Sequence, residues 1–371
     1  MHTYIHIPFC ARKCPYCSFY SVTNMSLEDL YFDALKQDIN SCEIIPSAAY
    51  TEQTDTVYVG GGTPSVPDSL KLCKAFESVR DKFSVSEGEF TIEVNPFSLS
   101  TGKARDYVAA GFNRISIGVQ SLHDGTLKTL GRLHDRKAAL RAIDVAAKAG
   151  FTNISCDLIT GVPGQKLEEI TEDADVLLAM GVKHISAYSL SIEEGTPFYD
   201  KYKGRLTEFV SEDEEREMYH GLRRVLQSRG MASYEISNSA YKGFESLHNL
   251  CYWDACEYYA FGAGSHGYLG DVRFAHPDNI KSYIENPSKV ITEETLTLDD
   301  KKKEFCMLAL RTSGGIDTME YKRRFKESFS DRFSEEILRL TEEGLIQSLE
   351  GRIFLTEKGL DLANIAFMEF I

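Results

Sequence analysis

Three cysteines lie close together near the start of the chain, at Cys10, Cys14 and Cys17. Their C-x3-C-x2-C spacing puts three thiolates on one loop, directly after a strand-like run from Tyr4 to Ile7. Three thiolates can hold three irons of a cubane iron-sulfur cluster, and the fourth iron then has no protein ligand. A metal with a free position can bind and activate another molecule, as catalytic zinc sites do. The cysteines therefore predict an open-site 4Fe-4S cluster.

A structural zinc site and a disulfide framework are the alternatives for these cysteines. Structural zinc needs a fourth ligand, usually from a second close pair, and an odd total of nine cysteines with no sign of export disfavours disulfides. The cysteines outside this loop are scattered along the chain: Cys42, Cys73, Cys156, Cys251, Cys256 and Cys306. Only Cys251 and Cys256 are near each other, and their spacing does not favour a structural zinc site. This distribution favours the cluster.

The overall composition excludes some classes of function. The 371 residues carry a formal net charge of -15, so general binding to nucleic acid or anionic lipid, which needs clustered Lys and Arg, is not expected. No stretch approaches the run of about eighteen apolar residues that a membrane span needs, and residues 1–20 lack a signal-peptide pattern. We expect a cytoplasmic protein.

The segment that must position the cysteine loop is a repeated unit of strand, turn and helix from residue 3 to about 230. Such alternation predicts parallel βαβ units, either in an open doubly wound sheet or in a barrel. The expected strands are 3–8, 56–60, 89–94, 114–119, 153–159 and 184–190. The expected helices are 27–42, 68–82, 100–110, 135–149, 167–180 and 211–229.

Polar and glycine residues fall at or just past the ends of these strands, and this favours the barrel. In a barrel such ends converge on one mouth, where active sites of that fold lie. Because there are six units instead of eight, the predicted fold is α/β, an incomplete (β/α)6 TIM-like barrel of parallel strands. The polar positions are Cys10, Gly60 to Thr63, Glu93 and Asn95, Gln120, Asp157 and Ser189.

The alternation of strand-like and helix-like segments stops after residue 230. We expect a partial barrel at 1–230, an aromatic and glycine-rich extension at 231–290, and a small, mainly helical, winged-helix-like domain at 291–371. The last prediction rests on a helix, hairpin, helix pattern between Glu342 and Gly359. The acidic composition favours a packing module over a nucleic-acid reader there.

Several strand-end residues could bind a ligand. Gly60, Gly61 and Gly62 with Thr63 lack the lysine of a phosphate loop, but bare glycine backbone lets carbonyl oxygens approach an ammonium group. A tight turn without a ligand is the alternative. Glu93, Gln120, Arg132 and Asp157 either face a polar ligand or form a structural network of ion pairs, because buried unpaired charge is costly.

Two motifs in the extension need separate interpretation. The stretch from Gly262 to Gly267 matches G-x-G-x-x-G, but a strand-like run follows it where a dinucleotide site needs a helix, so we reject that site. His248 lies beside the only tryptophan, and imidazole is a good ligand for haem iron. The residues alone favour a hydrogen-bonded structural histidine, with His266 and His276 as equal rivals for any ligand role.

Taken together, these motifs resemble those of the radical S-adenosylmethionine superfamily. More narrowly, they resemble its branch containing oxygen-independent coproporphyrinogen III oxidase and the HemW-type heme chaperones. The resemblance covers nearly the whole chain. It is carried by the cysteine trio, Gly60-Gly-Gly-Thr-Pro, Glu93-Val-Asn-Pro, Ile117-Gly-Val-Gln-Ser, Gly131-Arg-Leu-His and Asp157-Leu-Ile-Thr-Gly-Val-Pro-Gly-Gln.

The resemblance implies ligand roles for many of these residues. In this superfamily a reduced 4Fe-4S cluster passes an electron to S-adenosylmethionine and yields a 5'-deoxyadenosyl radical. The cluster would be bound by Cys10, Cys14 and Cys17. The cosubstrate would be bound by Tyr4, Tyr16, Gly61, Gly62, Thr63, Glu93, Gln120, Arg132 and Asp157.

Within this branch the resemblance favours a heme chaperone. The oxidases have a fourth cysteine where this chain has Phe19, whereas His248-Asn-Leu-Cys-Tyr252-Trp253 is similar to the H-N-x-x-Y-W motif of the chaperones. The resemblance thus implies heme as cargo at His248, Tyr252 and Trp253. Expected partners are an electron donor for the cluster, membrane-bound or respiratory haem proteins as acceptors, and a second copy of the chain in a homodimer. The alternatives are coproporphyrinogen III oxidase and a radical methyltransferase, and enzymatic activity is left open.

Overall fold

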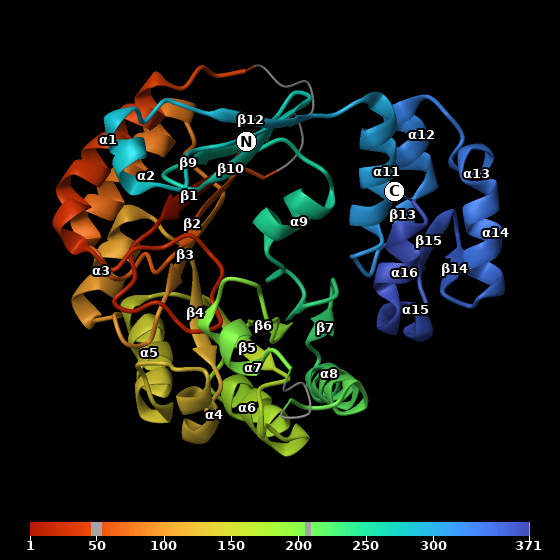
Figure 1. The fold of residues 1–371 in the computed structure, drawn as a ribbon, viewed down its shortest axis with the longest axis horizontal. Coiled ribbons are helices and arrows are strands. Elements are labelled where there is room, and N and C mark those ends of the chain that lie inside the picture. Colours follow the sequence, from red (N-terminus) through yellow and green to blue (C-terminus); the bar gives the residue numbers. More distant parts are fainter. Residues whose placement is uncertain (46–53, 205–208, 371) are drawn as a thin grey trace.

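The computed structural model describes residues 1–45, 54–204 and 209–370. Its main element is a nine-stranded sheet with the order β7-β8-β6-β5-β4-β3-β2-β1-β9 (Figure 1). The six parallel strands at its centre are β1 (His2–Ile7), β2 (Thr56–Gly61), β3 (Glu89–Val94), β4 (Arg114–Gln120), β5 (Asn153–Thr160) and β6 (His184–Ser189).

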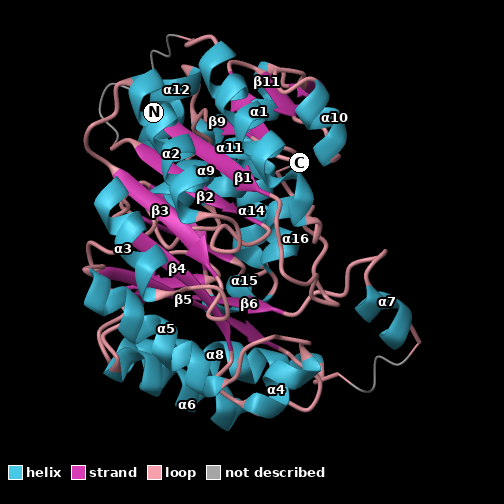
Figure 2. Cartoon of the chain, turned by 90° about the vertical axis from the view of Figure 1, so that its left-hand side faces the viewer, coloured by secondary structure: helices cyan, strands magenta, loops and turns pink. Residues whose placement is uncertain are grey.

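Helices connect these strands and cover the outer face of the sheet (Figure 2). They are α1 (Glu28–Ser41), α2 (Ser69–Phe83), α3 (Thr101–Ala110), α4 (Asp124–Thr129), α5 (Arg136–Ala149) and α6 (Leu167–Ala179). The short η1 (Met25–Leu27) precedes α1, and α7 (Pro197–Tyr202) and α8 (Glu212–Ser228) follow β6. Each predicted strand and helix is confirmed to within one residue or so at each end, and α4 and α7 are additional.

Short strands at both edges extend the sheet beyond the six expected units. β9 (Tyr259–Phe261) pairs in parallel with β1. At the other edge β8 (Asn238–Ala240) runs antiparallel to β6, and β7 (Ala232–Ser233) pairs with β8. The two edges do not pair with each other in the described strand order, so the predicted incomplete barrel of parallel strands is confirmed.

Local sequence explains where several of the helices begin. Asp68, Ser100 and Asp135 each accept a hydrogen bond from a backbone N–H of the first turn that follows. Ser211 and Glu214 form a capping box at the start of α8. These caps fix the loops that lead from the strand ends into the helices.

The segment after α8 packs a small sheet and a helix against the barrel. α9 (Leu247–Trp253) lies between the large sheet and the C-terminal helices (Figure 1). β10 (His266–Leu269), β11 (Val272–Ala275) and β12 (Ile291–Thr295) form an antiparallel sheet, and α10 (Ile280–Glu285) lies against α1. The rejected dinucleotide motif runs into β10, which begins at His266 within the motif, and not into a helix, in agreement with the rejection.

The C-terminal part has its own hydrophobic core. It contains α11 (Leu298–Ala309), β13 (Ile316–Asp317), α12 (Thr318–Phe325), α13 (Phe329–Arg332), α14 (Ser334–Glu342), β14 (Ile346–Leu349), β15 (Arg352–Leu355), α15 (Glu357–Asp361) and α16 (Ala363–Met368). Tyr321, Phe329, Phe333 and Phe370 pack together in a cluster separate from the barrel core. The helix, hairpin, helix pattern is present, whereas the three domain boundaries stay predictions.

No helix in the described ranges is both long and apolar enough to cross a lipid bilayer.

Candidate functional site at the carboxyl ends of the strands

A pocket of about 470 Å³ opens at the carboxyl ends of the parallel strands. Its wall includes eight of the nine side chains or glycines expected to hold the cosubstrate, together with Cys17 of the cysteine loop. The eight are Tyr16, Gly61, Gly62, Thr63, Glu93, Gln120, Arg132 and Asp157. These residues come from six separate segments of the chain, so the barrel fold is what gathers them.

Backbone hydrogen bonds shape the cysteine loop. The Cys10 N–H donates to the Val22 carbonyl at 2.9 Å, and the Cys17 N–H donates to the Cys14 carbonyl at 3.1 Å. The sulfur of Cys10 lies 3.5 Å from the Thr63 hydroxyl on the neighbouring glycine loop. All three cysteines are free thiols, and the loop therefore presents three soft ligands beside the pocket.

Arg132 links the cysteine loop to the fourth strand. Its Nη1 lies 3.5 Å from the Cys14 sulfur and 3.3 Å from the Tyr16 hydroxyl, and its Nη2 donates to the Gly118 carbonyl at 3.0 Å. Its Nε is buried without a hydrogen-bond partner. An unpartnered buried N–H is costly, so this atom is suited to an acceptor group of a bound molecule.

The glycine loop brings bare backbone next to the cysteines and to Glu93. Gly61 has a φ of +113°, and a Cβ on Gly62 would lie 2.9 Å from the Phe9 carbonyl oxygen and 3.1 Å from the Cys10 sulfur. The Gly61 N–H also donates to a carboxylate oxygen of Glu93 at 3.3 Å. Side chains at Gly61 and Gly62 would push the ends of β1 and β2 apart. Glycine at these positions lets the two strand ends lie close together.

Glu93 and Asp157 place two carboxyl groups on the pocket wall. Burial raises the pKa of Glu93 to about 7, although the Tyr58 hydroxyl donates to it at 2.7 Å. Burial also raises the pKa of Asp157, which accepts from the Ser116 hydroxyl at 3.1 Å. In both cases burial outweighs the hydrogen bonds and the nearby Arg114 guanidinium, so the charged form of each carboxyl is disfavoured in the ligand-free protein. Such a pair suits a ligand with an ammonium group or hydroxyls.

Gln120 has an unusual backbone conformation. Its φ is +67°, and the register between β4 and β5 shifts between Ile117 and Gln120. A positive φ at a residue other than glycine is uncommon and occurs often at functional sites. The irregularity directs the end of β4 into the pocket.

Tyr4 is the one predicted cosubstrate residue that does not line the pocket. Its hydroxyl lies 3.1 Å from His6 Nδ1, and its ring stacks on Tyr58 with centroids 6.2 Å apart. Sequence reasoning missed Tyr58, Arg114, Ser116, Ser186 and Tyr188, which also line the pocket. The signal that could have found several of them is strand alternation, since Tyr58 and Glu93, for example, lie on neighbouring inward-facing positions of β2 and β3.

The pocket fits the cluster and the cosubstrate in its donor chemistry. Three free thiols lie on one loop beside it, two carboxyl groups and an unpartnered guanidinium N–H face it, and bare glycine backbone borders it. Soft thiolates suit iron, and the polar groups match a charged amino acid moiety.

His248 is buried on α9 with both ring nitrogens engaged. Its Nδ1 lies 2.7 Å from the Thr56 hydroxyl and its Nε2 lies 2.8 Å from the Tyr252 hydroxyl. The side chain is 1% exposed, its ring stacks on Tyr58, and burial lowers its pKa to about 3. In this conformation neither nitrogen is presented to a cavity.

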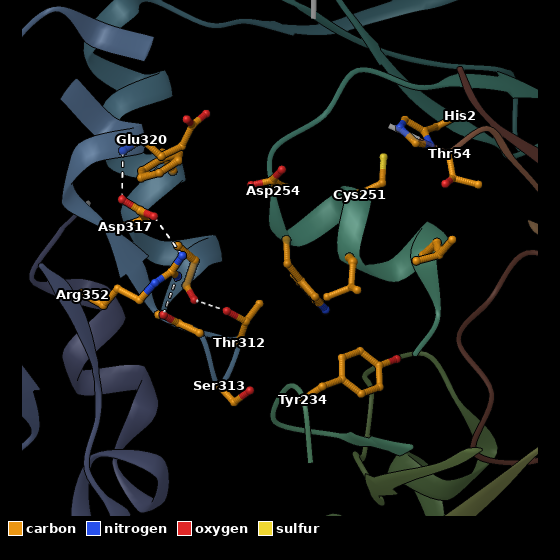
Figure 3. A pocket seen from close by; sticks show the side chains of 17 residues that line it. His2, Thr54, Tyr234, Cys251, Asp254, Thr312, Ser313, Asp317, Glu320 and Arg352 are labelled. Atoms are coloured by element: carbon orange, nitrogen blue, oxygen red, sulfur yellow. Dashed lines mark hydrogen bonds and ion pairs between the residues drawn. The ribbon is translucent and has the colours of Figure 1, made fainter. Parts of the chain in front are cut away.

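The neighbours of His248 border two different cavities. Asn249 lines the pocket at the strand ends, whereas Trp253 lines a second cavity of about 580 Å³ between α9 and the C-terminal part (Figure 3). The guanidinium of Arg311 lies over the Trp253 ring at 4.7 Å, and Tyr252 packs edge-on against Tyr258. The rivals His266 and His276 lie elsewhere: His266 faces solvent beside Glu293, and His276 is buried near Asp38.

Comparison with known proteins places the chain in a family. The Radical SAM superfamily model matches residues 4–177, and the HemN C-terminal domain model matches residues 296–362. The chain is 35% identical over 373 residues to the heme chaperone HemW of Lactococcus lactis subsp. lactis (strain IL1403), covering 99% of this chain and 96% of that protein. It is also 35% identical over 383 residues to the heme chaperone HemW of Bacillus subtilis (strain 168), covering 99% and 98%.

A solved structure supports the fold. Coproporphyrinogen III oxidase (HemN) from Escherichia coli, a radical SAM enzyme, superposes with a TM-score of 0.83 at 20% sequence identity, covering 99% of this chain and 89% of that one. At that identity the likeness establishes the fold alone. The full-length identity to the HemW proteins is the closer relationship, and the chain belongs to the HemW family of the radical SAM superfamily.

Proposed function

We propose that this protein is a heme chaperone that binds heme and passes it to haem proteins. The observation that carries the proposal is full-length similarity to proteins named heme chaperone HemW, together with the His248-Asn-Leu-Cys-Tyr252-Trp253 stretch. This stretch lies in α9, where Asn249 lines the strand-end pocket and Trp253 lines the cavity toward the C-terminal part. Heme bound along α9 would contact both parts of the molecule.

The strand-end pocket would hold a 4Fe-4S cluster and S-adenosylmethionine, as membership in the superfamily implies. Cys10, Cys14 and Cys17 would bind the cluster, and bound together the two groups supply one-electron reductive chemistry. Glu93 and Arg132 would bind the amino and carboxylate groups of the methionyl end. The remaining cosubstrate contacts would come from Tyr4, Tyr16, Gly61, Gly62, Thr63, Gln120 and Asp157.

His248 would ligate the heme iron after a local rearrangement of α9. Its Nε2 is 2.8 Å from the Tyr252 hydroxyl, so moving Tyr252 would release that nitrogen while Thr56 keeps Nδ1 in place. The lowered pKa keeps the imidazole neutral, which is the form that binds iron. Tyr252 and Trp253 would then offer aromatic surface to the porphyrin.

Anaerobic titration of the purified protein with heme tests this proposal. Wild type should bind one heme and show the absorption change of a histidine-ligated iron, and His248→Ala should bind at least about tenfold more weakly because its axial ligand is gone. His266→Ala is the matched control, since this histidine is exposed, and it should bind as wild type does. Equal, weak binding by all three proteins would refute the proposal.

The second candidate function is the oxygen-independent oxidation of coproporphyrinogen III. It is favoured by the convergence of eight expected cosubstrate residues on one pocket, because a chaperone that never used radical chemistry would not need them. Phe19 weighs against it, since this residue stands where the oxidases have a fourth cysteine. Anaerobic assay of the cluster-loaded protein with S-adenosylmethionine and coproporphyrinogen III decides: formation of vinyl groups would establish the enzyme, and none is expected.

The acceptor would be a respiratory or membrane-bound haem protein, and the cluster would need an electron donor. Crosslinking of the heme-loaded chain under anaerobic conditions tests for the haem acceptor, for the electron donor and for a homodimer. Recovery of a haem protein would support delivery.

A further inference from the structure

We propose that His2, Cys251 and Cys256 bind a zinc ion at the edge of the second cavity, separate from the iron-sulfur cluster. The ligand atoms of these three residues all lie within 4.8 Å of one another. Across the described ranges this is the one such group of three. The sulfurs of Cys10, Cys14 and Cys17 do not all lie within that distance of one another. They would each bind a different iron of the cluster, so they need not lie as close together as the ligands of a single ion.

The donor set selects a thiophilic ion. Two cysteine sulfurs and one imidazole are the ligands of known open zinc sites, which keep a fourth position for water or another molecule. Calcium and magnesium prefer oxygen ligands and are disfavoured here. The set also differs from that of the iron-sulfur cluster, which uses thiolates alone in this chain.

The fold holds the two cysteines on one short segment. Cys251 is in the last turn of α9, and the chain then turns back so that the Cys256 N–H donates to the Cys251 carbonyl at 3.0 Å. The other end of α9 is fixed by Glu89, whose carboxylate accepts from the backbone N–H groups of Leu247 and His248 at 3.1 Å. The sulfur pair is therefore positioned by backbone contacts and does not depend on a metal.

His2 reaches the sulfurs from the first strand. Its Nδ1 lies 2.9 Å from the Thr56 hydroxyl on β2, so this hydrogen bond orients the ring, and Nε2 would be the atom that binds the metal. A hydrogen-bonded second nitrogen is the usual arrangement of a metal-binding histidine. The same Thr56 hydroxyl contacts His248 Nδ1 at 2.7 Å, which connects the site to the motif on α9.

The fourth position would open toward the cavity. His2 and Cys251 both line the cavity of about 580 Å³, although each side chain is less than 5% exposed to bulk solvent (Figure 3). A small molecule entering the cavity could therefore reach the ion. Because the ligands come from β1 and from the end of α9, the ion would also fasten this helix to the barrel.

The test separates this site from the cluster by removing the cluster cysteines. The Cys10→Ala/Cys14→Ala/Cys17→Ala protein, untagged at its N-terminus because His2 is a ligand, is reduced and titrated anaerobically with Co²⁺ as a spectroscopic probe. One Co²⁺ per chain should bind with thiolate-to-metal absorption, and Zn²⁺ should displace it.

Single substitutions in the same background identify the ligands. Cys256→Ser and His2→Gln should each weaken zinc binding by at least about tenfold, because each removes one of three ligands. Cys42→Ser is the matched control, a partly buried free cysteine outside the site, and it should leave binding unchanged. Absence of the thiolate absorption, or its persistence in Cys256→Ser, would overturn the proposal.

A second measurement uses the intact chain with its cluster cysteines, in case the triple variant does not fold. X-ray absorption at the zinc edge of zinc-loaded wild-type protein does not detect iron. Two sulfur ligands with at least one nitrogen would support the site in the cluster-containing protein. Three or more sulfurs would mean that zinc occupies the cysteine loop, and no sulfur would mean an adventitious surface ion; either result contradicts the proposal.

Discussion

At the scale of single residues, Glu93 is the group whose environment is most informative. It is a carboxyl group on the pocket wall with hydrogen bonds from Tyr58 and Gly61, yet its pKa is raised from 4.5 to about 7 by burial. A cationic ligand would reverse this shift. We therefore predict that Glu93 binds an ammonium group, and that its buried carboxyl is a cost to the stability of the ligand-free protein.

That cost predicts a pH-dependent effect of Glu93→Gln on stability. Between about pH 4.5 and 7 the folded protein keeps a proton that the unfolded chain releases, so wild type loses stability as the pH rises through this window. The variant has no such group. At about pH 8 it should be more stable than ligand-free wild type by roughly 1–3 kcal/mol, and near pH 4 the two should be alike.

Urea unfolding of the ligand-free proteins at both pH values measures this difference. Glu77→Gln, at an exposed position of α2, is the control and should show no pH-dependent gain. S-adenosylmethionine binding should weaken in Glu93→Gln while stability improves. If the stability of both variants changes with pH in the same way, the buried Glu93 carboxyl does not destabilise the protein at high pH.

At the scale of elements, we predict that the contact between the cysteine loop and the glycine loop controls assembly of the cluster. Gly62→Ala should lower the iron content of the reconstituted protein several-fold, because its Cβ would lie 2.9 Å from the Phe9 carbonyl and 3.1 Å from the Cys10 sulfur. The strain should also cost about 1–3 kcal/mol of stability. Iron analysis after anaerobic reconstitution is the measurement.

Gly125→Ala provides the comparison for this variant. Gly125 is in α4, and a Cβ there would meet nothing within 4 Å. Full iron content is expected, with stability unchanged or raised by up to about 1 kcal/mol. Normal iron content in Gly62→Ala as well would show that the two loops are not tightly coupled.

The sequence predicted the strands and helices of the barrel well because each has a clear pattern and a cap or turn at its end. Eight of the nine residues expected to bind the cosubstrate line one pocket, since residues at the ends of parallel strands must converge. The edge strands β7, β8 and β9 were missed because two or three residues carry no periodicity. Expected roles for individual pocket residues remain predictions.

The surroundings of His248 could not be predicted for a different reason. Its Nδ1 partner Thr56 is 192 residues away in the chain, on β2, and only the folded sheet brings it near α9. The same holds for His2, which meets Cys251 through the pairing of β1 with β2. Side-chain contacts between segments so far apart leave no local signal in one sequence.

At the scale of the whole molecule, two separate cores meet near α9. Phe333→Ala should destabilise the C-terminal part by about 3–5 kcal/mol, because Phe333 is 2% exposed and packs against Tyr321, Phe329 and Phe370. Cluster content should be unchanged, since the cysteines that would bind the cluster belong to the barrel. Calorimetry with iron analysis of the same sample measures both.

Phe76→Ala is the matching variant in the barrel core, where it would leave a cavity. Phe76 is fully buried against Phe90 and Phe112. This variant should lose stability and iron together. If Phe333→Ala loses iron to the same extent, the two cores unfold as one unit, and the proposed division of the chain is wrong.

The central claim is that the molecule carries heme and releases it to an acceptor. The most direct measurement loads the cluster-containing protein with heme, removes excess heme, adds an apo-haem protein, and follows the absorption of each species over time. We predict that heme leaves this protein and appears in the acceptor, and that His248→Ala, which holds little heme, transfers little. Retention of the heme, or transfer no faster than from free heme in solution, would contradict a chaperone function.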